Sequence, residues 1–128
     1  MNKIKELIDK HSLKLDARDN PWELLSCPSA ETAFDFCLKE LNKCAIIKTQ
    51  NRSHTTYGYK HYMERLGCCY VYERVFTLAA MEAGFTITDD SAHSARINIS
   101  EKDVKRWGVD IREKEAAERM ANLLARSE

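Results

Sequence analysis

Apolar side chains recur every three to four residues along most of the chain, which is the spacing of amphipathic α-helices. This spacing predicts helices over residues 2–11, 30–46 and 56–66. Asn20, which is followed by a proline, predicts the start of another short helix. Residues 71–83 are apolar on nearly every side, so we expect them to form the central and most buried helix.

The pattern changes after these helices from helical spacing to strict alternation. Residues 85–88 and 96–99 each alternate apolar with polar side chains, and a seven-residue polar segment separates them. Alternation of this kind is typical of strands with one buried face. The sequence therefore predicts one two-stranded antiparallel hairpin within residues 85–99. Its core-facing side chains are expected to be Phe85, Ile87, Ile97 and Ile99.

The C-terminal segment is predicted to form two helices. Ser100 and Asp103 have the spacing of a capping box for a short helix that contains Trp107 and ends at Gly108. A last helix is expected to start at Asp110. The fold class that follows is α+β and mainly helical, with about six helices and one hairpin.

The order of helix 56–66, helix 71–83 and hairpin is also the order of a winged-helix domain, so a winged-helix-like fold is one interpretation. A recognition helix exposes several basic or polar side chains, and helix 71–83 offers few. These few are Glu73, Arg74, Thr77 and Glu82. A wing whose tip contains Asp89 and Asp90 would be repelled by phosphate.

Composition places the chain among globular proteins. Its 128 residues are 44% hydrophobic and 31% charged, which predicts a single domain spanning residues 1–128. No apolar run is long enough to cross a membrane, and the N-terminus lacks the apolar segment of a secretory signal. We therefore expect a cytoplasmic protein. With 20 basic and 20 acidic side chains, the chain is not a globally polycationic nucleic-acid binder.

The five cysteines are expected to be reduced thiols without a metal, because the chain shows no sign of secretion. A cluster of potential ligands occurs between residues 54 and 69. It consists of His54, His61, Glu64, Cys68 and Cys69. These residues do not have the paired spacings of zinc sites, so neither a metal nor another cofactor is predicted.

Positive charge is concentrated in the middle of the chain. Residues 41–74 contain six basic and two acidic side chains, whereas each flanking segment has a net charge of −2. All five tyrosines and two of the four histidines also lie in this middle segment. Basic side chains mixed with aromatic ones suit a phosphate backbone with stacked bases, or an acidic protein surface. The competing interpretation is an ordinary core with a solvated polar surface.

The densest group of polar and aromatic residues lies between residues 53 and 64. On a helix, Tyr57 and His61 are one turn apart, as are Lys60 and Glu64, and both pairs lie away from the apolar face. We name residues 48–65 the basic-aromatic strip. Its candidate binding residues are Lys48, Arg52, His54, Tyr57, Lys60, His61 and Arg65.

The run from Thr56 to His61, followed by a tyrosine and several apolar residues, resembles a segment of small uncharacterised proteins from phages and mobile elements. The later residues that carry the resemblance are Tyr70, Phe76, Ala79, Gly84 and Phe85. The resemblance covers about residues 53–100. It implies no activity, cofactor or assigned site.

Enzymatic activity is not predicted. The sequence contains no nucleophile elbow, Walker loop, dinucleotide-binding glycine motif or zinc-protease motif. The expected function is that of a non-catalytic regulatory protein that binds nucleic acid through the basic-aromatic strip. The alternative is an inhibitor or adaptor that docks on a host or partner protein with the same surface. No membrane partner is expected, and the sequence leaves the oligomeric state open.

Overall fold

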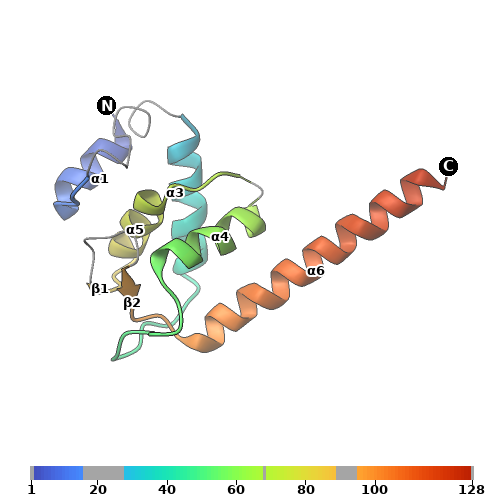
Figure 1. Cartoon of the computed structure of the whole chain (residues 1–128). Coiled ribbons are helices and arrows are strands. Elements are labelled where there is room, and N and C mark those ends of the chain that lie inside the picture. The colour runs from blue at the N-terminus through green and yellow to red at the C-terminus, as the bar shows by residue number, and fades with distance from the viewer. Residues whose placement is uncertain (1, 16–27, 68, 89–94, 128) are drawn as a thin grey trace.

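The computed structural model describes residues 2–15, 28–67, 69–88 and 95–127 of the chain (Figure 1). Its helices are α1 (Lys3–His11), α3 (Pro28–Leu41), α4 (Thr56–Gly67), α5 (Glu73–Glu82) and α6 (Glu101–Arg126). Its strands are β1 (Ile87–Thr88) and β2 (Arg96–Ile97). The predicted mainly helical α+β class is confirmed, with five helices among the described residues. The short helix predicted from Asn20 lies outside them.

Helix α5 is the central element, as its apolar sequence predicts. Every side chain from residue 73 to residue 80 is buried, and α5 contacts α1, α3 and α4 (Figure 1). Three polar residues of this helix were expected at its surface but lie in the interior. They are Glu73, Arg74 and Thr77. Their burial follows from the position of α5, because a helix enclosed by three others has little free surface.

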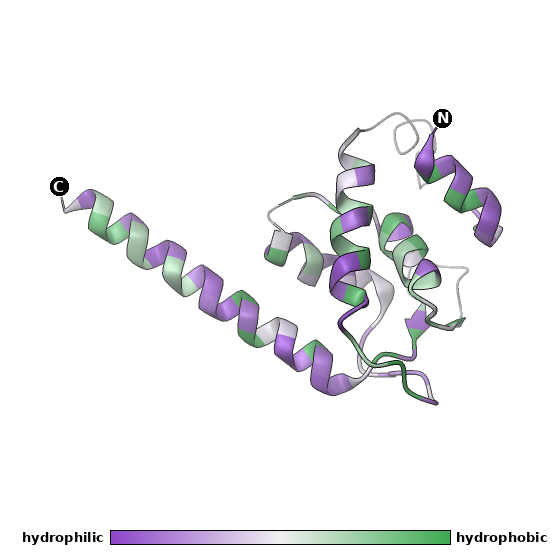
Figure 2. Ribbon diagram, turned by 180° about the vertical axis from the view of Figure 1, so that it is seen from behind, coloured by the Kyte–Doolittle hydropathy of each residue, from purple (hydrophilic) through white to green (hydrophobic). Residues whose placement is uncertain are grey.

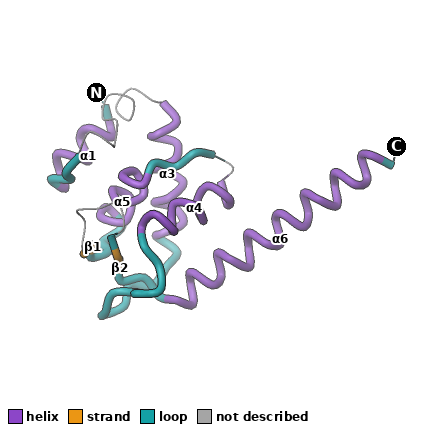
Figure 3. Tube along the Cα trace, viewed as in Figure 1, coloured by secondary structure: helices purple, strands orange, loops and turns teal. Residues whose placement is uncertain are grey.

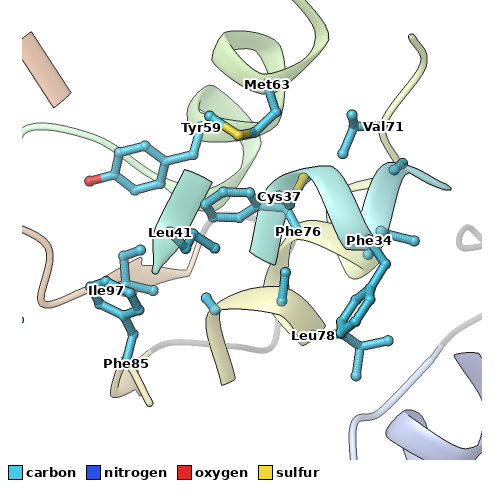
Figure 4. Packing of buried hydrophobic residues seen from close by; sticks show 14 of the residues in the cluster. Phe34, Cys37, Leu41, Tyr59, Met63, Val71, Phe76, Leu78, Phe85 and Ile97 are labelled. Carbon is cyan, nitrogen blue, oxygen red and sulfur yellow. The ribbon is translucent and has the colours of Figure 1, made fainter. Parts of the chain in front are cut away.

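The core gathers around α5, with side chains from α3, α4 and the hairpin packed on one another (Figure 4). Tyr59 stacks on Phe76, with ring centroids 5.6 Å apart and planes inclined by 27°. The largest fully buried side chain among the described residues is Trp107, whose ring meets Tyr59 edge to face at 6.2 Å. α6 is therefore attached to the core through its first half.

The predicted hairpin forms, with Ile87 opposite Ile97 and Thr88 opposite Arg96. It is shorter than expected, because the end of the second alternating segment pairs with another part of the chain. Ile99 forms an isolated antiparallel bridge with Ile46. This pairing also explains why α3 ends at Leu41, several residues before the predicted end of the helix.

The loop between α3 and α4 is consequently held against the start of α6 (Figure 3). The Ile47 amide donates to the Asn98 carbonyl at 2.8 Å, and the Asn51 amide donates to the Ile97 carbonyl at 2.9 Å. The Ala45 amide donates to the Asp103 carboxylate at 2.8 Å. The Asp103 side chain thus binds the loop. Ser100 forms no side-chain capping hydrogen bond, so the predicted capping box is not formed.

The two helices predicted at the C-terminus are one. α6 continues through Gly108 for 26 residues, a length of roughly 39 Å at 1.5 Å per residue. Val104, Trp107 and Ile111 anchor its first half, whereas residues 116–127 are all exposed and protrude from the body (Figure 1). The prediction that Gly108 ends a helix was wrong, because the packing of residues on both sides outweighs the weak helix preference of one glycine.

Two glycine substitutions test this backbone geometry. In Gly108→Ala, the added methyl group would make ordinary contact with Arg112 at 3.5 Å, so we expect stabilisation by about 0.5–1 kcal/mol. In Gly84→Ala, the residue has a φ of 96° in the turn after α5, so we expect a loss of about 1–2 kcal/mol. Urea unfolding followed by circular dichroism measures both. Destabilisation by Gly108→Ala would contradict a continuous α6.

Candidate binding surface

The basic-aromatic strip runs along the loop between α3 and α4 and then along α4 itself (Figure 1). Lys48 and Arg52 lie in the loop, and both are exposed. Neither forms an ion pair with any other described residue. These two cations are therefore available to an external anion.

His54 fastens this loop to α6. Its Nε2 lies 2.7 Å from Oε1 of Glu101, and its half-buried ring lies beside Tyr59 and Tyr62. The Asn51 side chain donates to the same carboxylate at 3.1 Å. Desolvation opposes the ionisation of Glu101, but these hydrogen bonds outweigh it and lower the pKa of the carboxyl below its ordinary value of 4.5. His54 is therefore bound to a partner within the chain, Glu101, and connects the loop to α6.

Lys60 is enclosed by its neighbours, although the sequence predicts a surface position. Only 6% of the residue is exposed, and its Nζ donates to the Val71 carbonyl at 3.1 Å and to Glu64 at 3.2 Å. The ammonium group also lies over the rings of Tyr57 and Tyr70, at 5.5 and 4.7 Å from their centroids. The predicted pair with Glu64 is confirmed, and the two side chains together hold the backbone of Val71, just before α5.

The predicted pair of Tyr57 and His61 is also confirmed. Their rings meet edge to face with centroids 4.8 Å apart. Tyr57 is 54% exposed, and His61 is exposed with its Nδ1 2.8 Å from Glu64. This pair therefore presents an aromatic surface in the first two turns of α4.

Arg65 joins α4 to α6. Its Nε donates to Oε1 of Glu115 at 2.9 Å, and its Nη2 donates to Oε2 at 3.2 Å. Lys114 reinforces this junction by donating to the carbonyls of Arg65 and Leu66, at 3.0 and 2.8 Å. Of the four cations in the strip, Lys60 and Arg65 thus have carboxylate partners within the chain.

The fold brings two further exposed cations to the loop, namely Lys102 and Lys105 in the first turns of α6. Lys105 is close enough to Glu101 for its charge to help lower the pKa of that carboxyl. Glu101 in turn contacts residues 51 and 54, which flank Arg52. We name Lys48, Arg52, Lys102 and Lys105 the basic end. Sequence analysis missed its α6 half because the C-terminal segment has a net negative charge.

A buried polar network lies beneath the start of α4. Glu73 and Arg74 are each only 4% exposed, and Nε of Arg74 is 2.5 Å from Oε1 of Glu73. Thr77 donates to the same carboxylate at 3.0 Å, and the Thr56 hydroxyl is a further donor. Desolvation opposes the charge on Glu73, but these donors lower its pKa below 4.5. The network connects α4 to α5.

These carboxylates predict acid sensitivity. Glu64, Glu73 and Glu101 all have pKa values below the ordinary 4.5 in the folded chain. The unfolded chain therefore binds more protons than the folded one as the pH drops, so stability is highest above about pH 4.5 and is lost below it. Urea midpoints measured across pH should fall on acidification, and less steeply in Glu73→Gln. A midpoint that rises on acidification would contradict these shifts.

Cys37, Cys44 and Cys69 are thiols that form no disulfide. Burial raises the pKa of Cys44 to about 11 and that of Cys37 further, so both are poor nucleophiles. In the part of the chain that the structure describes, no group of three or more histidine, cysteine or acidic side chains could hold a metal ion. Within the same residues, no helix is both long enough and apolar enough to cross a bilayer. The remaining cysteines, Cys27 and Cys68, lie outside the described residues.

Comparison of the chain with known protein families, with curated proteins and with solved structures finds no match. Any functional assignment therefore depends on the residues and geometry described above.

Proposed function

We propose that this protein is a non-catalytic, cytoplasmic regulatory protein that binds nucleic acid, and that the basic end makes its phosphate contacts. The observation that carries the proposal is the exposed charge of Lys48 and Arg52 on a loop that Asn51 and His54 bind to Glu101 of α6. The first turns of α6 carry the exposed Lys102 and Lys105. The nearest carboxylates, Glu101 and Asp103, already accept hydrogen bonds from within the chain. A local positive potential of this kind attracts a polyanion.

The aromatic half of the strip gives the second part of the proposal. Tyr57 lies in the first turn of α4, just after the loop that carries Arg52, and its ring is exposed beside His61. Exposed aromatic rings next to phosphate-binding cations are suited to base stacking. Lys60 binds a carboxylate and a carbonyl of the chain, and Arg65 binds a carboxylate. We assign these two residues the role of holding the aromatic surface in place.

A winged-helix docking mode is not part of the proposal. The order of α4, α5 and hairpin is that of a winged helix, but the side chains of residues 73–80 in α5 are buried. A recognition helix has to present its side chains to the major groove. The loop and α6 offer the exposed cations instead.

The experiment is a titration of the chain with single-stranded and duplex oligonucleotides at low salt. Reversing both loop cations, in Lys48→Glu with Arg52→Glu, is expected to lower affinity at least about tenfold, because two phosphate contacts become repulsive. The matched control, Lys5→Glu with Lys39→Glu, makes the same charge change at exposed positions of α1 and α3. Equal losses in both variants would show that only net charge matters and that the basic end is not the site.

One observation favours the alternative, a protein partner. Tyr57 and Tyr70 are 54% and 60% exposed, and tyrosine is enriched at the energetic centres of protein interfaces. If the wild type binds neither oligonucleotide at low salt, this alternative replaces the nucleic-acid proposal. An inhibitor or adaptor would then use the same surface.

A further inference from the structure

The protruding half of α6 carries an apolar stripe that nothing in the described chain covers (Figure 2). Met120, Leu123 and Leu124 are 58%, 58% and 63% exposed, and Val109 is also exposed. At 100° per residue, these side chains share one face of the helix with Ala116. A stripe of this length on an exposed helix is typical of a docking surface.

This stripe faces away from the body of the protein. The residues that anchor α6 to the core are Val104, Trp107 and Ile111, and they lie on the opposite side of the helix. From Val109 onward, a second helix could therefore lie along the stripe without meeting α4. The spacing of Val109, Ala116 and Leu123 is seven residues, which is the heptad repeat of a coiled coil.

The charges beside the stripe repeat with the same period. Four exposed basic residues follow one another at intervals of seven along one flank. They are Lys105, Arg112, Arg119 and Arg126. The other flank carries Asp110, Ala117 and Leu124. With Val109 and Ala116 at position d and Met120 at position a, the basic residues occupy g and the second flank occupies e.

We propose that α6 pairs in parallel with α6 of a second copy of this chain. In a parallel pair, position g of one helix also lies beside position a of the next heptad in the other, which brings Arg112 to Glu113 of the second copy. Glu113 also faces Glu113 of the second copy, so the two carboxylates lie between the two Arg112 guanidinium groups. An antiparallel pair would instead place the two basic flanks against each other, because g then faces g. The complementarity of Arg112 and Glu113 thus supports a second copy as the occupant, and the repulsion between basic flanks favours the parallel direction.

This inference does not rest on the proposed function, and its test contains no nucleic acid. A parallel pair has a two-fold axis along the paired helices, and this axis would relate the basic ends of the two copies. The pairing region of each copy is short, so we expect a reversible dimer whose population rises with concentration.

Sedimentation equilibrium of the full chain, up to about 1 mM, is the first measurement. The wild type is expected to form dimers, and Met120→Glu is expected to raise the dissociation constant at least about tenfold because it places a carboxylate in the apolar contact. Ala125→Glu makes the same charge change on the opposite face of α6 and should leave dimerisation unchanged. Both positions are exposed and remote from the core, so the fold should be preserved, which circular dichroism checks. A wild type that stays monomeric throughout overturns the proposal.

The direction of pairing has its own test. Arg112→Glu should weaken the dimer by placing two carboxylates together, and the exchange of Arg112→Glu with Glu113→Arg should restore it. In an antiparallel pair, Arg112→Glu would relieve the repulsion between basic flanks and strengthen association. Strengthening by the single variant therefore overturns the parallel arrangement.

Discussion

Replacing Arg74 with methionine is expected to lower the free energy of unfolding by about 3–5 kcal/mol, because it removes one partner of a buried ion pair, the guanidinium 2.5 Å from the Glu73 carboxylate. Both side chains are almost completely removed from water, and two other donors to Glu73, the Thr56 and Thr77 hydroxyls, are neutral. The energetic cost arises from the uncompensated charge more than from the lost attraction. Urea unfolding near neutral pH, followed by circular dichroism, measures it.

Two further variants separate this cause from the loss of any ion pair. Lys3→Met removes the exposed pair with Asp35 and should cost less than about 1 kcal/mol. The double variant Glu73→Leu with Arg74→Met should be less destabilised than Arg74→Met alone, since both charges of this buried pair are then removed. The network described here would be contradicted if the double variant lost as much stability as Glu73→Leu and Arg74→Met lose separately when their losses are added.

Trp107→Ala is expected to cost about 3–5 kcal/mol, because it removes the largest fully buried side chain and leaves a cavity between α4 and α6. The indole contacts the rings of Tyr59 and Tyr62, at centroid distances of 6.2 and 6.3 Å. It is therefore the main attachment of α6 to the core.

Urea unfolding also measures this effect, with Glu118→Ala as the control on the exposed part of α6. That control should change stability by less than about 0.5 kcal/mol. A loss below about 1 kcal/mol for Trp107→Ala would mean that α6 is not anchored by its first half.

The elements that sequence analysis predicts well are those whose apolar pattern decides their environment. The spacing of Tyr59, Tyr62, Met63 and Leu66 predicts α4, and the nearly unbroken apolar run predicts the central position of α5. The alternation around Ile87 and Ile97 predicts the hairpin, in which these two residues pair. In each case the local pattern and the tertiary packing favour the same structure.

The errors occur where tertiary contacts override a local signal. Gly108 has the character of a helix end, but Trp107 and Ile111 hold the helix on both sides of it. Ile46 continues a helical pattern, yet it pairs with Ile99 across the chain. The burial of Glu73 with Arg74 could not be predicted from spacing, because adjacent residues of a helix are not expected to pair on one face.

The candidate site was also predicted only in part, because the burial and the proximity of its cations depend on tertiary contacts. Lys48, Arg52, Tyr57 and His61 are exposed, as a binding surface requires. A count of charges along the sequence could not show that Lys60 is buried among Tyr57, Tyr70 and Val71. Nor could it show that Lys102 and Lys105 lie next to the loop, since that proximity depends on the bonds from Asn51 and His54 to Glu101.

The salt dependence of oligonucleotide binding tests the central claim, that the basic end binds phosphate, most directly. Binding of a labelled single strand and a labelled duplex to the wild type is measured at a series of salt concentrations. Four phosphate contacts predict that the logarithm of the association constant falls against the logarithm of salt with a slope of about −3 to −4 per bound chain. An absence of binding at low salt, or a slope near zero, would contradict the account.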